Sequence, residues 1–217
     1  MMKENLITGS NNEILDHLTH AEYGAHSILI YPDIQTLRET YSRYVKRQLE
    51  ENNEIVLILT YYETADKVRK TLSNSDFVNR GQAANSDNNS NGSSIIDVRK
   101  YEKEGSLMIM DSVKWYFGSD SNYEGADRLM SFFKQLVKKA ESLGKNGVSV
   151  IADLGSFYHH QSTEKLFEHE LSLPSKYEGM KFKGFCAYHK ADFDRRFTEE
   201  QKQKLLDHHS KALMIAN

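Results

Sequence analysis

The chain contains very little cysteine and no long apolar run. Its 217 residues include a single cysteine, Cys186, which cannot form a disulfide within the chain. No segment approaches the roughly 20 consecutive apolar residues that a membrane-spanning helix needs. The amino-terminal residues also lack the apolar stretch of a signal peptide. We therefore expect a cytoplasmic protein that works in a reducing compartment and has no membrane partner.

An excess of positive charge is absent as well. Lys and Arg number 28 against 31 Asp and Glu, which gives a formal net charge of −3. Nucleic-acid-binding domains carry basic residues to neutralise phosphates, so we expect no direct nucleic-acid partner. The 12 tyrosines and 10 phenylalanines are sufficient for a hydrophobic core, and the length favours one main domain. We assign this domain to residues 22–217 and treat residues 1–21 as a lead-in segment.

One segment has no large apolar side chain. Residues 83–94, AANSDNNSNGSS, contain eight Asn or Ser in twelve positions. Burial within this segment cannot offset the entropy of ordering it, so it is predicted to be a flexible surface insertion.

The remaining chain alternates between short apolar runs and amphipathic segments. The apolar runs predict strands at 27–31, 54–60, 107–110, 148–152, 181–188 and 211–215. Helical spacing of apolar residues predicts helices at 34–50, from 65 onward, and at 125–143, 163–171 and 198–208. Continuous apolar strands that alternate with helices are typical of a parallel sheet covered on both faces. The predicted fold class is therefore α/β, a three-layer domain with a mainly parallel central sheet.

Polar side chains follow most of the predicted strands. Ligands of open parallel sheets bind beyond the carboxyl ends of the strands, which we call the rim. Carboxylates, tyrosines and a histidine are expected at the rim: Tyr31, Asp33, Tyr61, Tyr62, Glu63, Asp111, Asp153, Tyr188 and His189. An apolar strand that ends in Asp, such as VSVIAD, can hold magnesium. It is also common for a simpler reason, because Asp caps the turn that follows.

A phosphate-binding loop is missing after the first predicted strand. Such a loop needs G-x-x-x-x-G-K-S/T, whereas this chain has YPDIQTLRET at that place. Pro32 removes an amide donor, and Asp33 adds negative charge where phosphates would lie. Conventional ATP hydrolysis is therefore not expected, and no residue is assigned a catalytic role.

Two segments resemble a known family. His26 and Tyr31 form an HxxxxY pattern, and residues 184–188, GFCAY, support it. Together they resemble the MEDS domain, a sensory module named for methanogens, methylotrophs and the dichloromethane regulator DcmR. The resemblance extends from about residue 22 to residue 209. It implies a fold like that of the RecA and KaiC ATPases without their phosphate loop, and small organic compounds or hydrocarbon derivatives as ligands.

A further likeness lies at residues 60–64, TYYET. It is similar to the segment in which KaiC-type ATPases carry paired catalytic glutamates, but only Glu63 remains here and Tyr62 occupies the other place. The resemblance thus implies a sensory domain whose ancestor hydrolysed ATP. No DNA-binding helix-turn-helix is expected before residue 22, so a repressor activity is not carried over.

Our main hypothesis is a non-catalytic sensory domain that binds a small organic ligand at the rim. A signalling protein or a transcription regulator would receive the signal. The expected ligand-binding residues are His26, Tyr31, Tyr62, Glu63, Asp153 and Tyr188. Two alternatives stay open. One is a degenerate nucleotide-binding enzyme with residual ATPase activity, in which Glu63 acts as base and Asp111 or Asp153 holds magnesium. The other is a scaffold that self-associates as a homo-oligomer.

Several of these side chains also have purely structural interpretations. His26 can satisfy a buried backbone group instead of a ligand. Cys186 can be an inert small hydrophobe instead of a redox sensor. The pairs His159–His160 and His208–His209 have no accompanying cysteine cluster and are expected on solvated faces, so no metal site and no cofactor are predicted.

Overall fold

The computed structural model describes residues 6–74, 96–118, 123, 125–159 and 163–216. Its centre is a sheet of seven strands in the order β1-β7-β2-β6-β5-β3-β4, and all of its strand pairs are parallel. The strands are β1 (Leu6–Gly9), β2 (His26–Tyr31), β3 (Ile55–Thr60), β4 (Leu107–Asp111), β5 (Val148–Asp153), β6 (Phe182–His189) and β7 (Lys211–Ile215). The predicted insertion at 83–94 lies outside the described residues.

The central strands are buried on both faces. Every residue of β2, β3 and β5 is buried, as expected for parallel strands covered by helices on either side. Side chains alternate between two separate hydrophobic clusters. Ile28 and Ile30 of β2 join one cluster, whereas Leu29 and Tyr31 join the other.

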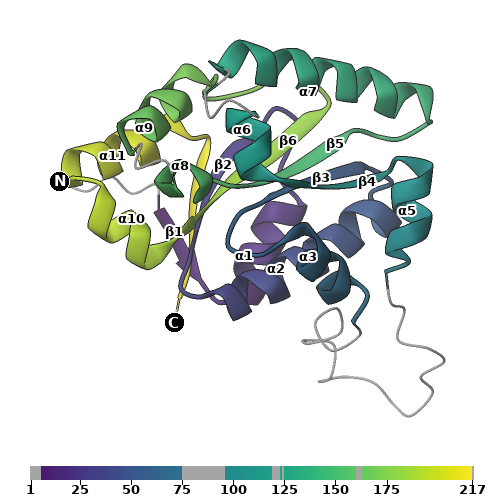
Figure 1. Ribbon diagram of the computed structural model, residues 1–217, viewed down its shortest axis with the longest axis horizontal. Coiled ribbons are helices and arrows are strands. Elements are labelled where there is room, and N and C mark those ends of the chain that lie inside the picture. Colours follow the sequence, from purple (N-terminus) through teal and green to yellow (C-terminus); the bar gives the residue numbers. More distant parts are fainter. Residues whose placement is uncertain (1–5, 75–95, 119–122, 124, 160–162, 217) are drawn as a thin grey trace.

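The two helical layers are built from different parts of the chain (Figure 1). The first layer comes from the amino-terminal half: α1 (Asn11–Thr19), α2 (Ile34–Lys46) with the π-helical turn η1 (Arg47–Glu51), α3 (Ala65–Leu72) and α5 (Val98–Glu104). The second layer comes from the rest: α6 (Ser112–Phe117), α7 (Gly125–Ser142), α8 (Ser156–His159), α9 (Thr163–Ser172), α10 (Lys190–Arg196) and α11 (Glu199–His208). The predicted three-layer α/β architecture is confirmed.

The long periodic elements agree with the sequence. The predicted helix at 198–208 begins as expected at a capping box, in which the Thr198 hydroxyl accepts from the Gln201 amide and the Gln201 side chain accepts from the Thr198 amide. The predicted helix at 34–50 continues as η1 up to Glu51. The short elements β1, α1, α5, α6, α8 and α10 were not predicted. Each is ten residues or shorter and offers too few turns for a periodic pattern.

An ion pair is buried near the amino ends of the strands. Lys183 Nζ lies 3.1 Å from Glu54 Oε1, and both side chains are almost inaccessible to solvent. The Tyr23 hydroxyl donates to the same oxygen at 2.9 Å, and the Ser149 hydroxyl donates to the other. A buried charge pair is tolerated when its remaining polar atoms are also satisfied, as they are here.

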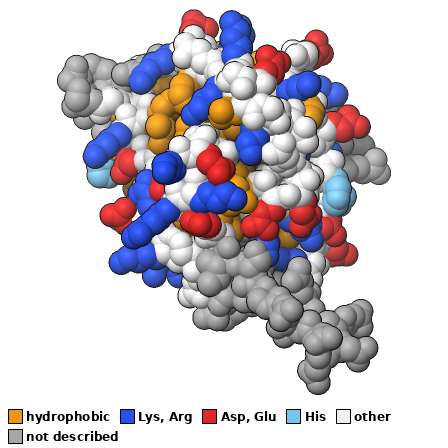
Figure 2. Space-filling model, turned by 90° about the vertical axis from the view of Figure 1, so that its right-hand side faces the viewer, with side chains coloured by type: hydrophobic (Ala, Val, Ile, Leu, Met, Phe, Trp, Pro, Cys, Tyr) orange, Lys and Arg blue, Asp and Glu red, His pale blue; other side chains and the backbone are white. Residues whose placement is uncertain are grey.

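The surface carries mixed charge. On the face shown in Figure 2, basic and acidic side chains are interspersed, and hydrophobic side chains form only narrow strips between them. None of the helices in the described ranges combines the length and apolar character needed to span a bilayer.

Candidate functional site

Four of the six expected ligand residues gather at the rim. Tyr31 ends β2, Asp153 ends β5, and Tyr62 and Glu63 follow β3. The Tyr62 amide donates to Asp153 Oδ2 at 3.2 Å. The Tyr62 ring also packs against His189, and so does the Tyr31 ring from its own strand. These four residues, which the sequence predicted at the rim, therefore lie together at this edge of the sheet.

Asp153 is the most perturbed acid of the rim. Its carboxylate is buried and accepts from three backbone amides, those of Tyr61, Tyr62 and Gly155, at 3.3, 3.2 and 3.0 Å. Burial raises the pKa of Asp153 to about 6, although the three amides oppose the shift and the charge of Glu63 adds to it. Asp153 thus changes charge close to neutral pH.

Two tyrosine hydroxyls near Asp153 are buried without a partner. Among the described residues, neither the Tyr31 hydroxyl nor the Tyr158 hydroxyl has a hydrogen-bond partner. Burial and the charges of Asp153 and Asp192 raise the pKa of both phenols well above the usual value, so both stay protonated. A buried hydroxyl that lacks a partner costs about 1–3 kcal/mol, so these two groups call for a water or a ligand.

The cavity beside Asp153 is small, and neither Tyr31 nor Tyr158 is among its lining residues. A cavity of about 20 Å³ lies between the sheet and the first helical layer, where Tyr62, Glu63 and Asp153 contribute its polar wall. Leu37, Ile58 and Val68 are among its apolar lining residues. This volume suits about one water.

The place of a phosphate loop is taken by a carboxylate. Asp33 is the N-cap of α2, and its side chain accepts from the Thr36 amide at 2.9 Å. The Thr36 hydroxyl donates to its second oxygen at 3.0 Å. The helix terminus that would attract phosphate therefore already holds the negative charge of its own chain.

Glu63 and Asp111 are engaged in local contacts. Arg38 binds Glu63 at 2.8 Å, and the Tyr41 hydroxyl donates to its other oxygen at 3.1 Å. Asp111 caps α6 by accepting from the Lys114 amide at 3.0 Å. The simpler capping role of a strand-terminal Asp, weighed above against magnesium binding, accounts for this residue.

The other two expected residues, His26 and Tyr188, lie away from this group. His26 is the first residue of β2, at the amino end of the sheet, so it is not at the rim. Tyr188 is near the carboxyl end of β6 but faces the second helical layer. Both approach Glu170 of α9: the Tyr188 hydroxyl donates to Glu170 Oε1 at 2.6 Å, and His26 Nε2 lies 3.6 Å from Oε2.

Around Glu170 lies a group that we call the buried cluster, composed of His26, Glu170, Cys186 and His209. Its four candidate ligand atoms lie within 4.8 Å of one another, and all four side chains are buried. It is a group of the kind that holds a metal ion. His209 was expected on a solvated face, and that expectation is wrong.

The charges of the buried cluster are set by burial and by mutual contacts. Burial lowers the pKa of His26 to about 3, and His209 adds to this shift, so the ring is neutral. Burial raises the pKa of the Cys186 thiol well above its usual value. Burial also opposes the charged form of Glu170, but the facing His209 and His26 outweigh it and keep the pKa of Glu170 below its usual value.

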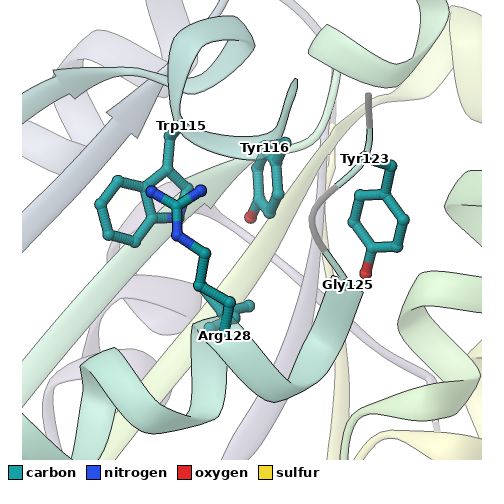
Figure 3. Close-up of a pocket in the computed structure, with 6 residues that line it drawn as sticks. Trp115, Tyr116, Tyr123, Gly125 and Arg128 are labelled. Atoms are coloured by element: carbon teal, nitrogen blue, oxygen red, sulfur yellow. The ribbon is translucent and has the colours of Figure 1, made fainter. Parts of the chain in front are cut away.

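Further hollows lie in the second helical layer and at the amino ends of the strands. A cavity of about 20 Å³ adjoins His26 and Cys186. A smaller cavity of about 10 Å³ at the start of α7 is also lined by Tyr116 and Leu129. There the Arg128 guanidinium lies over the Trp115 ring (Figure 3). A larger open hollow of about 450 Å³ lies at the amino ends of β2 and β7, lined by His20, Glu22, Tyr23, Gly24, Ala25, Lys176, Glu178, Ser210 and Lys211.

Comparison with known proteins identifies the family. The family model described as the MEthanogen/methylotroph, DcmR Sensory domain, or MEDS, matches residues 87–209, more than half of the chain. This chain belongs to the MEDS family. The resemblance to this family is confirmed over residues 87–209, and with it a sensory role in general terms, whereas the pattern of His26 and Tyr31 lies outside the matched residues. The boundary at residue 22 stays a prediction.

Comparison with solved structures gives a more distant likeness. The chain is similar to a KaiC-like protein from the hyperthermophilic archaeon Pyrococcus horikoshii OT3, with 15% identity and a TM-score of 0.46. The aligned region covers 77% of this MEDS chain and 62% of that protein, so the chain spans less than two thirds of its length. None of the curated proteins matches this chain.

The buried cluster is the part of the molecule that the sequence did not reveal. Its members come from residues 26, 170, 186 and 209, so no short spacing motif connects them. His26 and Cys186 belong to the two segments that carry the family resemblance. That shared membership was the one available signal, and nothing in the sequence pointed to Glu170.

Proposed function

We propose that this MEDS domain is a non-catalytic sensor that binds a small, neutral, hydrogen-bonding organic molecule at the rim. The observation that carries the proposal is the pair of buried hydroxyls of Tyr31 and Tyr158, which lack partners among the described residues. The charge of Asp153 contributes to the raised pKa of both phenols, so both hydroxyls lie within electrostatic reach of its carboxyl. A molecule with one donor and one acceptor, such as an alcohol or an amide, would satisfy these groups together.

The absence of catalysis is part of the proposal. Asp33 occupies the helix terminus that a phosphate would need. Glu63, the residue at a place where related ATPases have catalytic glutamates, is held by Arg38 and Tyr41. A general base needs a free carboxylate within reach of the proton that it removes, and these contacts occupy Glu63.

The size of the rim cavity limits the ligand. About 20 Å³ holds about one water, so a ligand of a few heavy atoms requires the cavity to enlarge on binding. The best small ligands gain about 1.5 kcal/mol for each heavy atom, so a molecule of three heavy atoms binds with a Kd on the order of 1 mM. Sensing therefore requires a ligand that is abundant in the cell.

We also propose a relay to a partner protein that starts at Asp153. Its carboxyl holds the amides of Tyr61 and Tyr62 in the loop after β3. The same loop is tied to α2 through the Arg38–Glu63 ion pair. A ligand that competes for Asp153 would shift this loop and alter the adjoining surface, which a signalling protein or a transcription regulator would read.

The test is an NMR titration of the isotopically labelled chain with a panel of alcohols, amides and other organic molecules of two to four heavy atoms. We expect saturable shifts of the Tyr61 and Tyr62 amides at millimolar ligand. Tyr31→Phe and Tyr158→Phe should each weaken binding several-fold. The matched control is Tyr44→Phe, because the Tyr44 hydroxyl is also buried but is bonded to Ser149.

Other outcomes would overturn the proposal. Binding weakened by Ser210→Ala in the amino-end hollow and not by the tyrosine variants would place the ligand elsewhere. Shifts with ATP, together with phosphate release that Glu63→Gln abolishes, would favour a residual ATPase. Light scattering that shows an oligomer dissociated by rim substitutions would favour a scaffold.

A further inference from the structure

Four of the six separations between ligand atoms of the buried cluster match those of a tetrahedral metal site. Bonds of 2.0–2.3 Å from a zinc ion to nitrogen, oxygen and sulfur place neighbouring ligand atoms about 3.3–3.6 Å apart. His209 Nε2 and His26 Nε2 lie 3.3 and 3.6 Å from Glu170 Oε2. Cys186 Sγ lies 3.5 Å from the same oxygen and 3.4 Å from His26 Nε2. The two remaining pairs are within 4.8 Å.

Both histidine rings are oriented by backbone carbonyls. His26 Nδ1 lies 3.0 Å from the Pro174 carbonyl oxygen, and His209 Nδ1 lies 2.7 Å from that of Leu205. A carbonyl can only accept, so each Nδ1 carries a proton, and each ring turns its Nε2 into the cluster. This is the arrangement that outer contacts impose on metal-binding histidines.

The atoms in front of the two Nε2 atoms belong to Glu170 and Cys186. His209 Nε2 is buried and has no hydrogen-bond partner in the described part of the chain, and the group in front of it is the Glu170 carboxylate. In that same part of the chain the ion-pair contacts of Glu170 are with His26 and His209. A divalent ion with one carboxylate, one thiolate and two neutral imidazoles has a net charge of zero. Neutrality of this kind is what burial requires.

We propose that His26, Glu170, Cys186 and His209 form a closed four-ligand site for a divalent metal ion of the zinc class. A thiolate and two imidazoles favour zinc over magnesium or calcium, and four protein ligands leave no open position for a substrate. The site goes beyond the proposed sensing role and does not depend on the rim. It joins β2, β6 and α9 to the residue that follows α11, so it fastens the second helical layer to the sheet.

Tyr188 is a positioning residue for this site. Its hydroxyl donates to Glu170 Oε1 and leaves Oε2 toward the metal. Such outer contacts typically contribute 10–100-fold to metal affinity. Tyr188→Phe should therefore weaken binding by about this factor while the stoichiometry stays at one ion for each chain.

The test uses the full chain. Because the site is buried, the chain is unfolded in guanidinium with a chelator and refolded with Zn²⁺, with Co²⁺ or without metal, and the desalted protein is analysed for metal content. We expect one tightly held ion for each chain. The cobalt form should show the intense visible bands of a tetrahedral site and a thiolate-to-cobalt charge-transfer band in the near ultraviolet.

Variants separate this site from adventitious binding. Cys186→Ala and the conservative Cys186→Ser should abolish the charge-transfer band and weaken binding by about 100-fold or more, since the loss of a ligand exceeds the loss of an outer contact. His208→Gln is the matched control. His208 neighbours His209, but its Nε2 bonds to the Leu173 carbonyl, so metal content and spectrum should not change.

Two results would overturn the proposal. One is a chain that refolds with excess metal and retains none after desalting. Protons on the side chains of the buried cluster would then balance its negative charge in place of a metal ion. The other is a bound ion whose spectrum shows no thiolate and survives both Cys186 variants, which would assign the ion to surface histidines. The tyrosine variants at the rim should leave metal content unchanged, so the two proposals can fail separately.

Discussion

Asp153 should make the stability of this domain depend on pH in an unusual direction. Its pKa is about 6 in the folded chain against 3.8 for an unperturbed aspartate, mainly because its carboxyl is buried. Between these two values the folded state keeps the proton and the unfolded state releases it. The unfolded state then binds fewer protons, so the free energy of unfolding falls as pH rises from about 4 to about 6.

The size of this effect follows from the two pKa values. At about 1.36 kcal/mol for each pKa unit, the difference corresponds to about 3 kcal/mol. The stabilisation is fully present below pH 3.8 and is lost as pH rises through 6. Most paired aspartates behave in the opposite way, because their folded pKa lies below the unfolded one.

The measurement is guanidinium unfolding at a series of pH values between 3.5 and 7, for the unsubstituted chain and for Asp153→Asn. The amide side chain cannot titrate, although it gives up an acceptor for one of the three backbone amides. At low pH the substitution should therefore lower the free energy of unfolding by a constant amount relative to the unsubstituted chain. Above pH 6 this difference between the two proteins should be smaller. Parallel curves for the two proteins across this range would refute the assignment of a raised pKa to Asp153.

Two further predictions concern the buried ion pair of Lys183 and Glu54 and the close packing around Gly155. Lys183→Met should lower the free energy of unfolding by about 3–5 kcal/mol because it leaves the buried Glu54 carboxylate without its positively charged partner. Adding Glu54→Leu should recover a large part of this loss, measured by chemical denaturation. A double variant no more stable than Lys183→Met would contradict this. Gly155→Ala would place its methyl 2.3 Å from the Tyr61 ring and should cost about 1–3 kcal/mol. Gly184→Ala, whose methyl meets nothing closer than 3.4 Å, is the control, and equal losses of melting temperature would refute the argument.

The sequence predicted the sheet because its strands are continuous apolar runs. Segments such as residues 55–60, IVLILT, can only be accommodated between two covering layers. The order of the strands could not be predicted, since hydrophobicity along a strand does not specify its neighbour. The edge strand β1 escaped detection because its four residues are only partly buried or exposed.

The rim was predictable for the same reason as the sheet. Once the strand ends were placed, Tyr31, Tyr62, Glu63 and Asp153 had to meet at one edge. His26 was misplaced because a residue that begins a strand lies at the opposite edge from one that ends it. Tyr188 and Tyr31 lie on opposite faces of the sheet. To predict this, one must know which residue of each strand points to which helical layer.

The order of the strands has a consequence for how the protein is made. β2 lies between β6 and β7, and β1 pairs with β7 alone. β1 therefore has no neighbour until β7 (Lys211–Ile215) has left the ribosome, and β2 has none until β6 (Phe182–His189) has done so. Until then the apolar HSILIY segment of β2 has no edge to dock on. Nascent chains of this domain should be poor at folding on the ribosome and dependent on holding chaperones.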